Sequence, residues 1–233
     1  MVIPSYNQRA RAVRAAKEAA GFLRDRFGSA AELLIVDDGS REDQVPTAAE
    51  LPPGTTLVAL GKNQGKGGAV AAGVLRARGE SVLFTDSDLP FGLEPIPTTL
   101  AWLEQGADIV IGDRLLPESE CAAHVTPMRR LSSATFTWVV RNLVGLRFPD
   151  TQCGYKAYKA RVARPLYQAL EIRSFAFDVE ILRRAVSAGY QVRRQPLRLV
   201  HNEDSSVQLS RHAPQMFADT LRIAWRHRLG HYA

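Results

Sequence analysis

The stretch that decides the fold is Ser81-Val82-Leu83-Phe84-Thr85-Asp86-Ser87-Asp88. Its apolar residues are consecutive, whereas a strand with one solvated face alternates apolar and polar residues. We therefore predict a strand over residues 81–84 that is buried on both faces of a sheet. Two carboxylates, Asp86 and Asp88, follow directly after this strand.

Similar apolar runs occur on either side of this strand, separated by stretches with helical periodicity. Strands are predicted at residues 1–3, 33–36, 56–60 and 108–111, and helices at residues 7–27, 65–78 and 95–104. This alternation predicts an α/β fold with a mostly parallel central sheet and helices on both faces. Ligands of such sheets bind beyond the carboxyl ends of the strands, where three polar clusters fall: residues 4–7, 37–40 and 86–88.

The second half of the chain is less regular. We predict a loop at residues 113–127, helices at 128–145, 179–187 and 212–228, and strands at 154–159 and 190–200. Neither an internal repeat nor a linker divides the chain, so residues 1–233 are expected to form a single domain.

The composition is ordinary for a soluble globular protein, with 45% hydrophobic and 23% charged residues. Cys121 and Cys153 lack metal-ligand spacing and cannot staple a chain of 233 residues, so we expect a reducing, cytoplasmic location. The net charge of +6 comes mainly from arginine, which indicates either anionic partners or a solvated basic surface. Nucleic acid is not an expected partner, because the basic residues are dispersed.

Neither a secretory leader pattern nor an apolar run of about 20 residues is present, so the protein is expected to be soluble or peripheral to the membrane. The last predicted helix interleaves apolar and basic residues: Leu221, Ile223 and Trp225 with Arg222, Arg226 and Arg228. This pattern is typical either of a helix that lies on an anionic membrane surface or of an ordinary packing helix.

Asp86 and Asp88 are candidate metal ligands. Residues two apart in an extended segment share a face, and paired carboxylates suit Mg²⁺ or Mn²⁺ with diphosphate oxygens as further ligands. The metal would stabilise charge on a departing nucleoside diphosphate. The alternative is a solvated turn with an acidic helix cap, but the position after a buried strand favours the metal site.

Residues 61–68 form a lysine- and glycine-rich loop that precedes a helix. Such a loop attracts phosphate through backbone amides and lysines, although it fits neither the P-loop pattern nor the dinucleotide-binding fingerprint. The alternative is a plain helix start.

Arg114, Arg129 and Arg130 are candidate phosphate ligands or surface charges. Asp178 and Glu180 begin a predicted helix, where each is either a general base or an acid favoured by the helix dipole.

These motifs together resemble the inverting family 2 glycosyltransferases of the GT-A fold, and most closely the dolichyl- or polyprenyl-phosphate glucose and mannose synthases. The resemblance runs through residues 2–7, 36–40, 63–69, 85–90 and 111–114, and it is most specific at residues 150–156 and 177–180. It implies that residues 1–112 are a nucleotide-sugar-binding half and residues 113–233 an acceptor-binding half.

The resemblance also implies roles for individual residues. The nucleotide-sugar would be held by Pro4, Tyr6, Gln8, Asp37, Asp38, Lys66, Gly67, Asp86, Ser87 and Asp88. Asp86 and Asp88 would bind the metal, and Arg114, Arg129 and Arg130 would face the acceptor phosphate. Catalytic roles would fall to Asp88, Asp178 and Arg114. A phosphate acceptor is already anionic and would not require a strong base, whereas a hydroxyl acceptor would require Asp178 or another acid.

Two positions depart from the family pattern: Gln8 replaces a usual Glu, and Ser206 replaces a usual Lys, a charge that Arg211 could supply. The expected function is transfer of a hexose to a polyprenyl- or dolichyl-phosphate acceptor, with UDP-glucose favoured as donor and GDP-mannose as the other candidate. The alternatives are a soluble enzyme that glycosylates a small, phosphorylated or unphosphorylated metabolite, and a non-catalytic protein that binds nucleotide-sugars.

Overall fold

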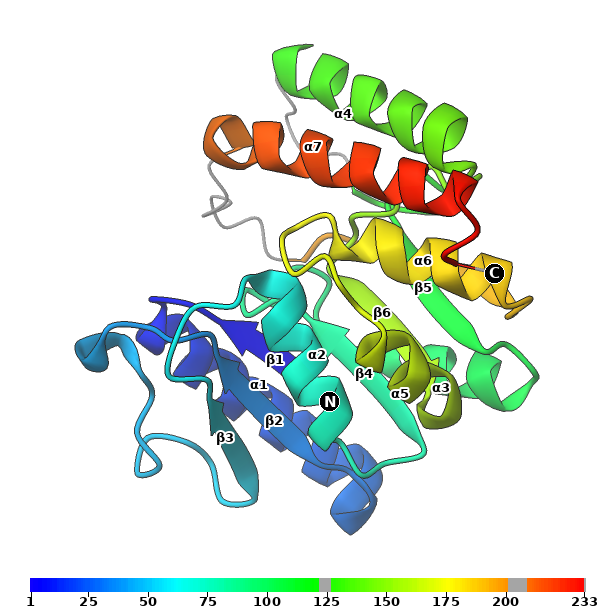
Figure 1. Cartoon of the computed structure of the whole chain (residues 1–233). Helices are drawn as coiled ribbons and strands as arrows, with labels where there is room; N and C mark the ends of the chain where they lie inside the picture. Colours follow the sequence, from blue (N-terminus) through cyan, green and yellow to red (C-terminus); the bar gives the residue numbers. More distant parts are fainter. Residues whose placement is uncertain (122–126, 201–208, 233) are drawn as a thin grey trace.

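The computed structural model describes residues 1–121, 127–200 and 209–232, and for residues 127–132 and 209–212 it describes only the backbone. The described residues form seven strands: β1 (Val2–Ser5), β2 (Leu33–Asp37), β3 (Thr55–Ala59), β4 (Ser81–Thr85), β5 (Ile109–Asp113), β6 (Tyr155–Lys159) and β7 (Val192–Pro196). They make one sheet in the order β3-β2-β1-β4-β6-β5-β7 (Figure 1). Strand β6 is antiparallel to β4 and β5, and the other neighbouring pairs are parallel.

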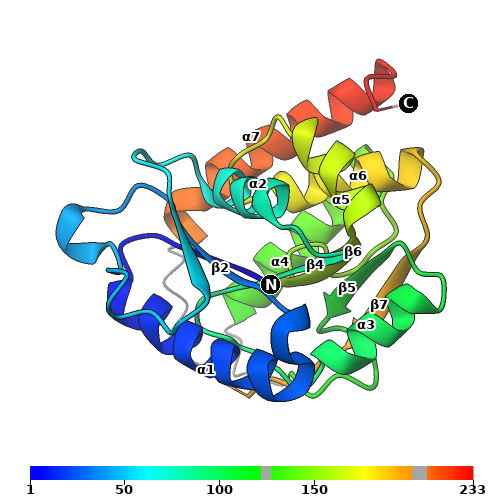
Figure 2. The same ribbon diagram turned by 90° about the horizontal axis from the view of Figure 1, so that it is seen from below.

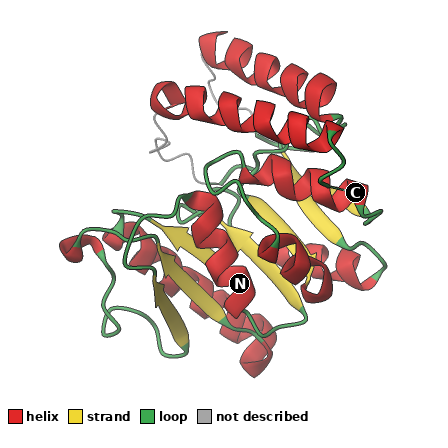
Figure 3. Ribbon diagram, in the orientation of Figure 1, coloured by secondary structure: helices red, strands yellow, loops and turns green. Residues whose placement is uncertain are grey.

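Helices cover both faces of this sheet (Figure 3). They are α1 (Arg9–Phe27), α2 (Lys66–Arg76), α3 (Ile96–Glu104), α4 (Pro127–Val139), α5 (Ala160–Gln168), α6 (Phe177–Ser187) and α7 (Leu209–Arg228), with short helical turns η1 (Gly28–Ala30), η2 (Glu42–Gln44) and η3 (Val140–Val144). Figure 2 shows α1 and α3 on one face and α2, α5 and α6 on the other. Helix α7 packs against α6 and against η3, a π-helical turn that continues α4.

Two hydrophobic clusters, one on each face, explain why β1, β2, β4 and β5 are mostly apolar. Leu34 and Val36 of β2 contribute to the cluster under α2, α5 and α6, while Leu33 and Ile35 contribute to the cluster under α1 and α3. Successive side chains of a strand point to opposite faces, so both sets must be apolar. The predicted α/β fold with a mostly parallel sheet is therefore confirmed.

The second half shows the largest departures from the predicted elements. No element was predicted at residues 160–168, yet α5 lies there and buries Val162, Ala163 and Leu166 although Pro165 stands inside it. Packing against α2 outweighs the helix-breaking tendency of that proline. The strand predicted at residues 190–200 is limited to β7, because residues 197–200 leave the ladder. Among the described helices, none has the length and apolar character needed to cross a bilayer.

The order of the strands creates a crevice between β1 and β4. From β1 the chain proceeds to β2 and β3 on one side, while β4 lies on the other side. Loops that follow β1 and β4 diverge at such a switch point and leave room for a ligand. Residues 6–8 and 86–88 belong to these loops.

Candidate active site

A pocket of about 930 Å³ opens at this crevice, within the size range of small-molecule sites. Of the residues predicted to bind the nucleotide-sugar, eight line the pocket: Pro4, Tyr6, Gln8, Asp38, Lys66, Asp86, Ser87 and Asp88. They come from the ends of β1, β2 and β4 and the start of α2. The residues that the sequence patterns identified therefore meet in one cavity.

The acidic pair lies in this pocket just beyond β4. Burial and the neighbouring Asp86 carboxylate raise the pKa of Asp88, so a second negative charge there is unfavourable without a cation. Among the described residues, no group of three or more His, Cys, Asp or Glu side chains has metal-site geometry. The acidic pair itself offers two carboxylates to the pocket. This matches Mg²⁺ or Mn²⁺, which commonly take their remaining ligands from water and phosphate oxygens.

Lys66, the first residue of α2, faces the acidic pair. Its Nζ lies 2.6 Å from Asp86 Oδ1. Burial alone would lower the pKa of Lys66, but Asp86, Asp178 and Asp88 outweigh burial and raise it, so the side chain stays cationic. An ammonium group at a helix N-terminus is well placed to meet a diphosphate.

Two non-glycine residues at the edge of the sheet near the pocket have a backbone conformation that is rare for residues with a side chain. Among the described residues, Asn7 (φ 52°) and Leu89 (φ 44°) are the non-glycine residues with positive φ, and they follow β1 and β4 respectively. Asn7 is held by two hydrogen bonds: its N–H donates to Ser40 Oγ (2.7 Å), and its Oδ1 accepts from the Arg41 N–H (2.9 Å). Such strain persists only where neighbours enforce it, as functional sites often do.

Asp37 and Asp38 are adjacent but have different surroundings. The Asp37 carboxylate accepts hydrogen bonds from the Ser40 N–H and hydroxyl, so it fixes the turn that holds Asn7 and does not line the pocket. Asp38 lines the pocket and accepts a hydrogen bond from the Gln64 N–H (2.7 Å). Burial raises the pKa of Asp38 to about 6, although the Gln64 and Gly65 amides oppose the rise.

Asp38 is therefore expected to make stability depend on pH. Between about pH 4 and pH 6 the folded protein keeps a proton that the unfolded chain has lost, so this residue's contribution to stability falls as pH rises through that window. An asparagine cannot titrate. The free energy of unfolding of the wild type, relative to Asp38→Asn, should decline from pH 4 to pH 6 and then level off in urea titrations. Parallel pH profiles for the two proteins would contradict this, and Asp25→Asn, at an exposed position, is the control.

Gly67 and Gly154 are required by close packing. A Cβ on Gly67 would collide with the Phe177 side chain, and the Gly67 N–H donates to the Arg173 carbonyl (2.8 Å), so Gly67 joins α2 to the loop before α6 and does not line the pocket. A Cβ on Gly154 would collide with the Asp86 carboxylate. The chain just before β6 therefore forms the wall behind the acidic pair.

Asp178 lies behind Lys66 and is not among the pocket-lining residues. Its Oδ1 is 2.8 Å from Nζ of Lys156, and both side chains are almost completely buried. The Lys156 ammonium also donates to the Cys153 carbonyl (2.6 Å). Burial raises the pKa of Asp178 even though Lys156 and Lys66 oppose the rise. Negatively and positively charged side chains therefore alternate from the pocket into the interior, in the order Asp86, Lys66, Asp178 and Lys156.

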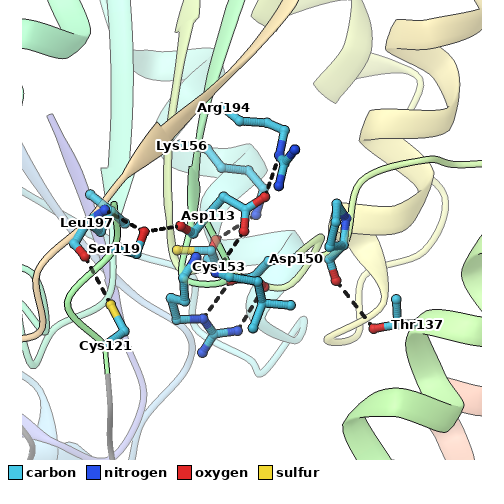
Figure 4. Close-up of polar contacts among 12 residues, drawn as sticks. Asp113, Ser119, Cys121, Thr137, Asp150, Cys153, Lys156, Arg194 and Leu197 are labelled. Carbon is cyan, nitrogen blue, oxygen red and sulfur yellow. Dashed lines mark hydrogen bonds and ion pairs between the residues drawn. The ribbon is translucent and has the colours of Figure 1, made fainter. Parts of the chain in front are cut away.

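Arg114 forms a two-pronged pair with Asp150, through Nε at 2.7 Å and a terminal nitrogen at 2.8 Å, and it does not line the pocket. Figure 4 shows Asp150 near Cys153, Asp113 and Lys156, with Arg194 directed at Asp113. This polar cluster fastens residues 150–153 to the end of β5. Arg129 and Arg130 lie in the first turn of α4, where side chains are outside the described part of the structure, as are Ser206 and the side chain of Arg211.

Three pocket cations were not predicted from the sequence: Arg11, Arg173 and Arg222. Arg173 donates to the Gln64 side chain (2.7 Å) from the loop before α6, and Arg222 comes from α7. Ser174 donates to Asp219 of α7 (2.6 Å), which holds that helix at the pocket rim. No sequence motif marks these residues: Arg11 lies in the first turn of α1, and the packing of α6 and α7 brings Arg173 and Arg222 to the pocket.

The comparisons with known proteins agree with this geometry. The model of the family "Glycosyl transferase family 2" matches residues 1–164, so the chain belongs to this family and is a glycosyltransferase. The resemblance found in the sequence is thereby confirmed.

Relatives with the same printed name match most of the chain. The dolichyl-phosphate beta-glucosyltransferase of Dictyostelium discoideum is 29% identical over 244 residues, covering 99% of this chain and 75% of its own. The human dolichyl-phosphate beta-glucosyltransferase is 31% identical over 201 residues, covering 78% of this chain and 61% of its own.

Solved structures share the fold at lower identity. Glucosyl-3-phosphoglycerate synthase from Mycobacterium tuberculosis, in complex with Mn²⁺, UDP-glucose and phosphoglyceric acid, has a TM-score of 0.65 and 20% identity, covering 96% of this chain and 78% of that chain. Mannosyl-3-phosphoglycerate synthase from Rubrobacter xylanophilus has a TM-score of 0.65 and 20% identity, covering 97% and 72%.

Proposed function

We propose that this glycosyltransferase moves glucose from UDP-glucose to dolichyl phosphate or a similar polyprenyl phosphate, with Mg²⁺ or Mn²⁺ as cofactor. The observation that carries the proposal is the match, along 99% of the chain, to a relative named dolichyl-phosphate beta-glucosyltransferase. The pocket supports it, because it combines an acidic pair suited to a metal diphosphate with cations suited to a second phosphate.

The donor would occupy the side of the pocket built by residues 1–112. The base and ribose would contact Pro4, Tyr6 and Asp38. Gln8 would act by fixing Ser87, because its side-chain oxygen accepts a hydrogen bond from the Ser87 hydroxyl at 3.2 Å. Asp86 and Asp88 would hold the metal, which supplies charge stabilisation for the departing diphosphate. Lys66 would add a fixed positive charge to the same leaving group.

The acceptor phosphate would meet the side built by residues 113–233. Arg173 and Arg222 are the pocket cations that this half contributes, and we assign them the role first expected of Arg114, Arg129 and Arg130. A phosphate held there needs no deprotonation by a base, so it would attack the anomeric carbon opposite the nucleotide and invert it. Asp178, buried against Lys156, would position Lys66 and would take no proton from the acceptor.

The proposal predicts that Asp86→Asn lowers the rate of glucose transfer by at least about a hundredfold, because the metal and diphosphate lose a charged ligand. The assay is incubation with UDP-[¹⁴C]glucose, Mg²⁺ or Mn²⁺, and a polyprenyl phosphate, followed by extraction of radioactive glycolipid. Asp25→Asn is the matched control at an exposed site.

Three outcomes of the same assay separate the alternatives. Failure of the wild type with every common nucleotide-sugar would exclude the polyprenyl-phosphate proposal. Faster transfer to a small phosphorylated acceptor, such as 3-phosphoglycerate, would favour a metabolite-glycosylating enzyme with the same fold. Unchanged turnover in Asp86→Asn would remove the acidic pair from the mechanism.

We also propose a cytoplasmic location, since both cysteines are free thiols.

A further inference from the structure

Helix α7 has an outer face that the rest of the described structure does not cover. Phe217, Leu221, Trp225 and Leu229 are spaced four residues apart, so they form one stripe along the helix and its last turn. Their exposed fractions are 46%, 40%, 66% and 61%. The opposite side of the helix is buried at Thr220, Ile223 and Ala224. Packing against the body of the protein therefore accounts for one side of α7 and leaves the apolar stripe unexplained.

The exposed charged side chains of α7 beside this stripe are arginines. Arg222 and Arg228 flank it, and the exposed residues between 213 and 230 include no Asp or Glu. An exposed apolar stripe with arginines at its margins is the pattern of a helix that lies in the interface of an anionic bilayer. Tryptophan is well suited to that boundary, because its ring is apolar and its N–H is polar, and arginine stems can extend toward lipid headgroups.

We propose that the outer face of α7, defined by Phe217, Leu221, Trp225 and Leu229 with Arg222 and Arg228, docks on the surface of an anionic lipid bilayer. This inference goes beyond the transfer reaction and holds whatever the donor is.

A second copy of the chain fits this surface less well. Pairing of α7 with α7 across a two-fold axis would bring the arginines of both copies together. The carboxylate partner of Arg222 is Glu171, which lies 3.9 Å away and already pairs with Arg226 and Arg184, so it cannot compensate a second set of arginines. An anionic bilayer provides the missing countercharge and also accepts the apolar side chains.

The docked orientation has a consequence for the pocket. Gln215, Asp219 and Arg222 of α7 line the pocket, so the helix is both its rim and the proposed membrane contact. Glu171 in the loop before α6 pairs with Arg226 of α7 and with Arg184 of α6, which ties the helix to the rim. Figure 2 shows α7 at the outer edge of the layer formed by α2, α5 and α6. Docking would therefore bring the pocket opening close to the headgroups.

The test is flotation of the full chain with phosphatidylcholine vesicles, with and without phosphatidylserine. The wild type should float with the anionic vesicles and release at high salt. Leu221→Ser/Leu229→Ser should bind on the order of tenfold more weakly. The matched control is Leu75→Ser/Leu115→Ser, which removes two leucines of nearly equal exposure (40% and 62%) elsewhere on the surface and should float like the wild type.

Glucose transfer to a short, water-soluble isoprenyl phosphate should be the same in all three proteins, which separates docking from the proposed function. Equal flotation of the two double variants would overturn the proposal. Failure of the wild type to float with the vesicles that contain phosphatidylserine would overturn it too. A wild-type dimer in light scattering that Leu221→Ser/Leu229→Ser dissociates would assign the surface to a second copy instead.

Discussion

Gly154→Ala is expected to lower kcat/KM for glucose transfer by at least about a hundredfold while the protein still folds, because displacement of catalytic groups by about 1 Å can cost that much. The added methyl group would occupy the place of the Asp86 carboxylate, which would have to move from its position in the pocket. Gly154 is not among the glycines with positive φ, so alanine would introduce no backbone strain to complicate the result.

The prediction is specific for the acidic pair, so Mn²⁺ binding, measured by electron paramagnetic resonance with UDP present, should weaken together with the rate. Gly21→Ala is the matched control: a Cβ there meets nothing within 4 Å, and alanine is the better residue inside a helix. Gly154→Ala with wild-type Mn²⁺ binding and wild-type turnover would mean that the wall behind Asp86 can yield at little cost.

Lys156→Met is expected to lower the free energy of unfolding by roughly 3–5 kcal/mol, which is typical when one partner of a buried ion pair is removed. Lys156 is fully buried, and its loss leaves the Asp178 carboxylate without the ammonium that lies 2.8 Å away. Urea denaturation followed by circular dichroism would measure the change.

A second substitution distinguishes lost charge pairing from lost packing. Adding Asp178→Asn to Lys156→Met removes the isolated carboxylate and should restore a large part of the stability; no recovery would show that packing of the lysine stem dominates. Lys159→Met is the control, because Lys159 is partly exposed and lies 3.9 Å from Asp108, so its loss should cost less than about 1 kcal/mol.

The sequence predicted the frame of the fold well, for a physical reason. Strands buried on both faces, such as β2 and β4, are apolar along their middle, and their polar residues lie at the ends of the strand, where the sheet ends. The acidic pair and the neighbouring clusters could therefore be located at one edge of the sheet before the structure was known.

The sequence could not decide which of two similar neighbours faces the ligand. Asp37 and Asp38 are chemically identical, and only the turn at Ser40 directs the first inward and leaves the second in the pocket. Arg114 resembled a phosphate ligand until Asp150, 36 residues away, was found to hold its guanidinium. Arg173 and Arg222 gave no signal, because their place depends on helix packing and not on local pattern.

Because β6 pairs with both β4 and β5, the site can be completed only after β6 has been synthesised. A ribosome completes β4 and β5 before β6, yet the two earlier strands do not pair with each other and must leave edges open until residues 155–159 emerge. Unpaired strand edges can pair with other chains, so the incomplete chain is prone to aggregation at this stage. The backbone at Gly154 that supports Asp86 is synthesised about seventy residues after Asp86 itself, so catalytic competence is one of the last properties that the nascent chain acquires.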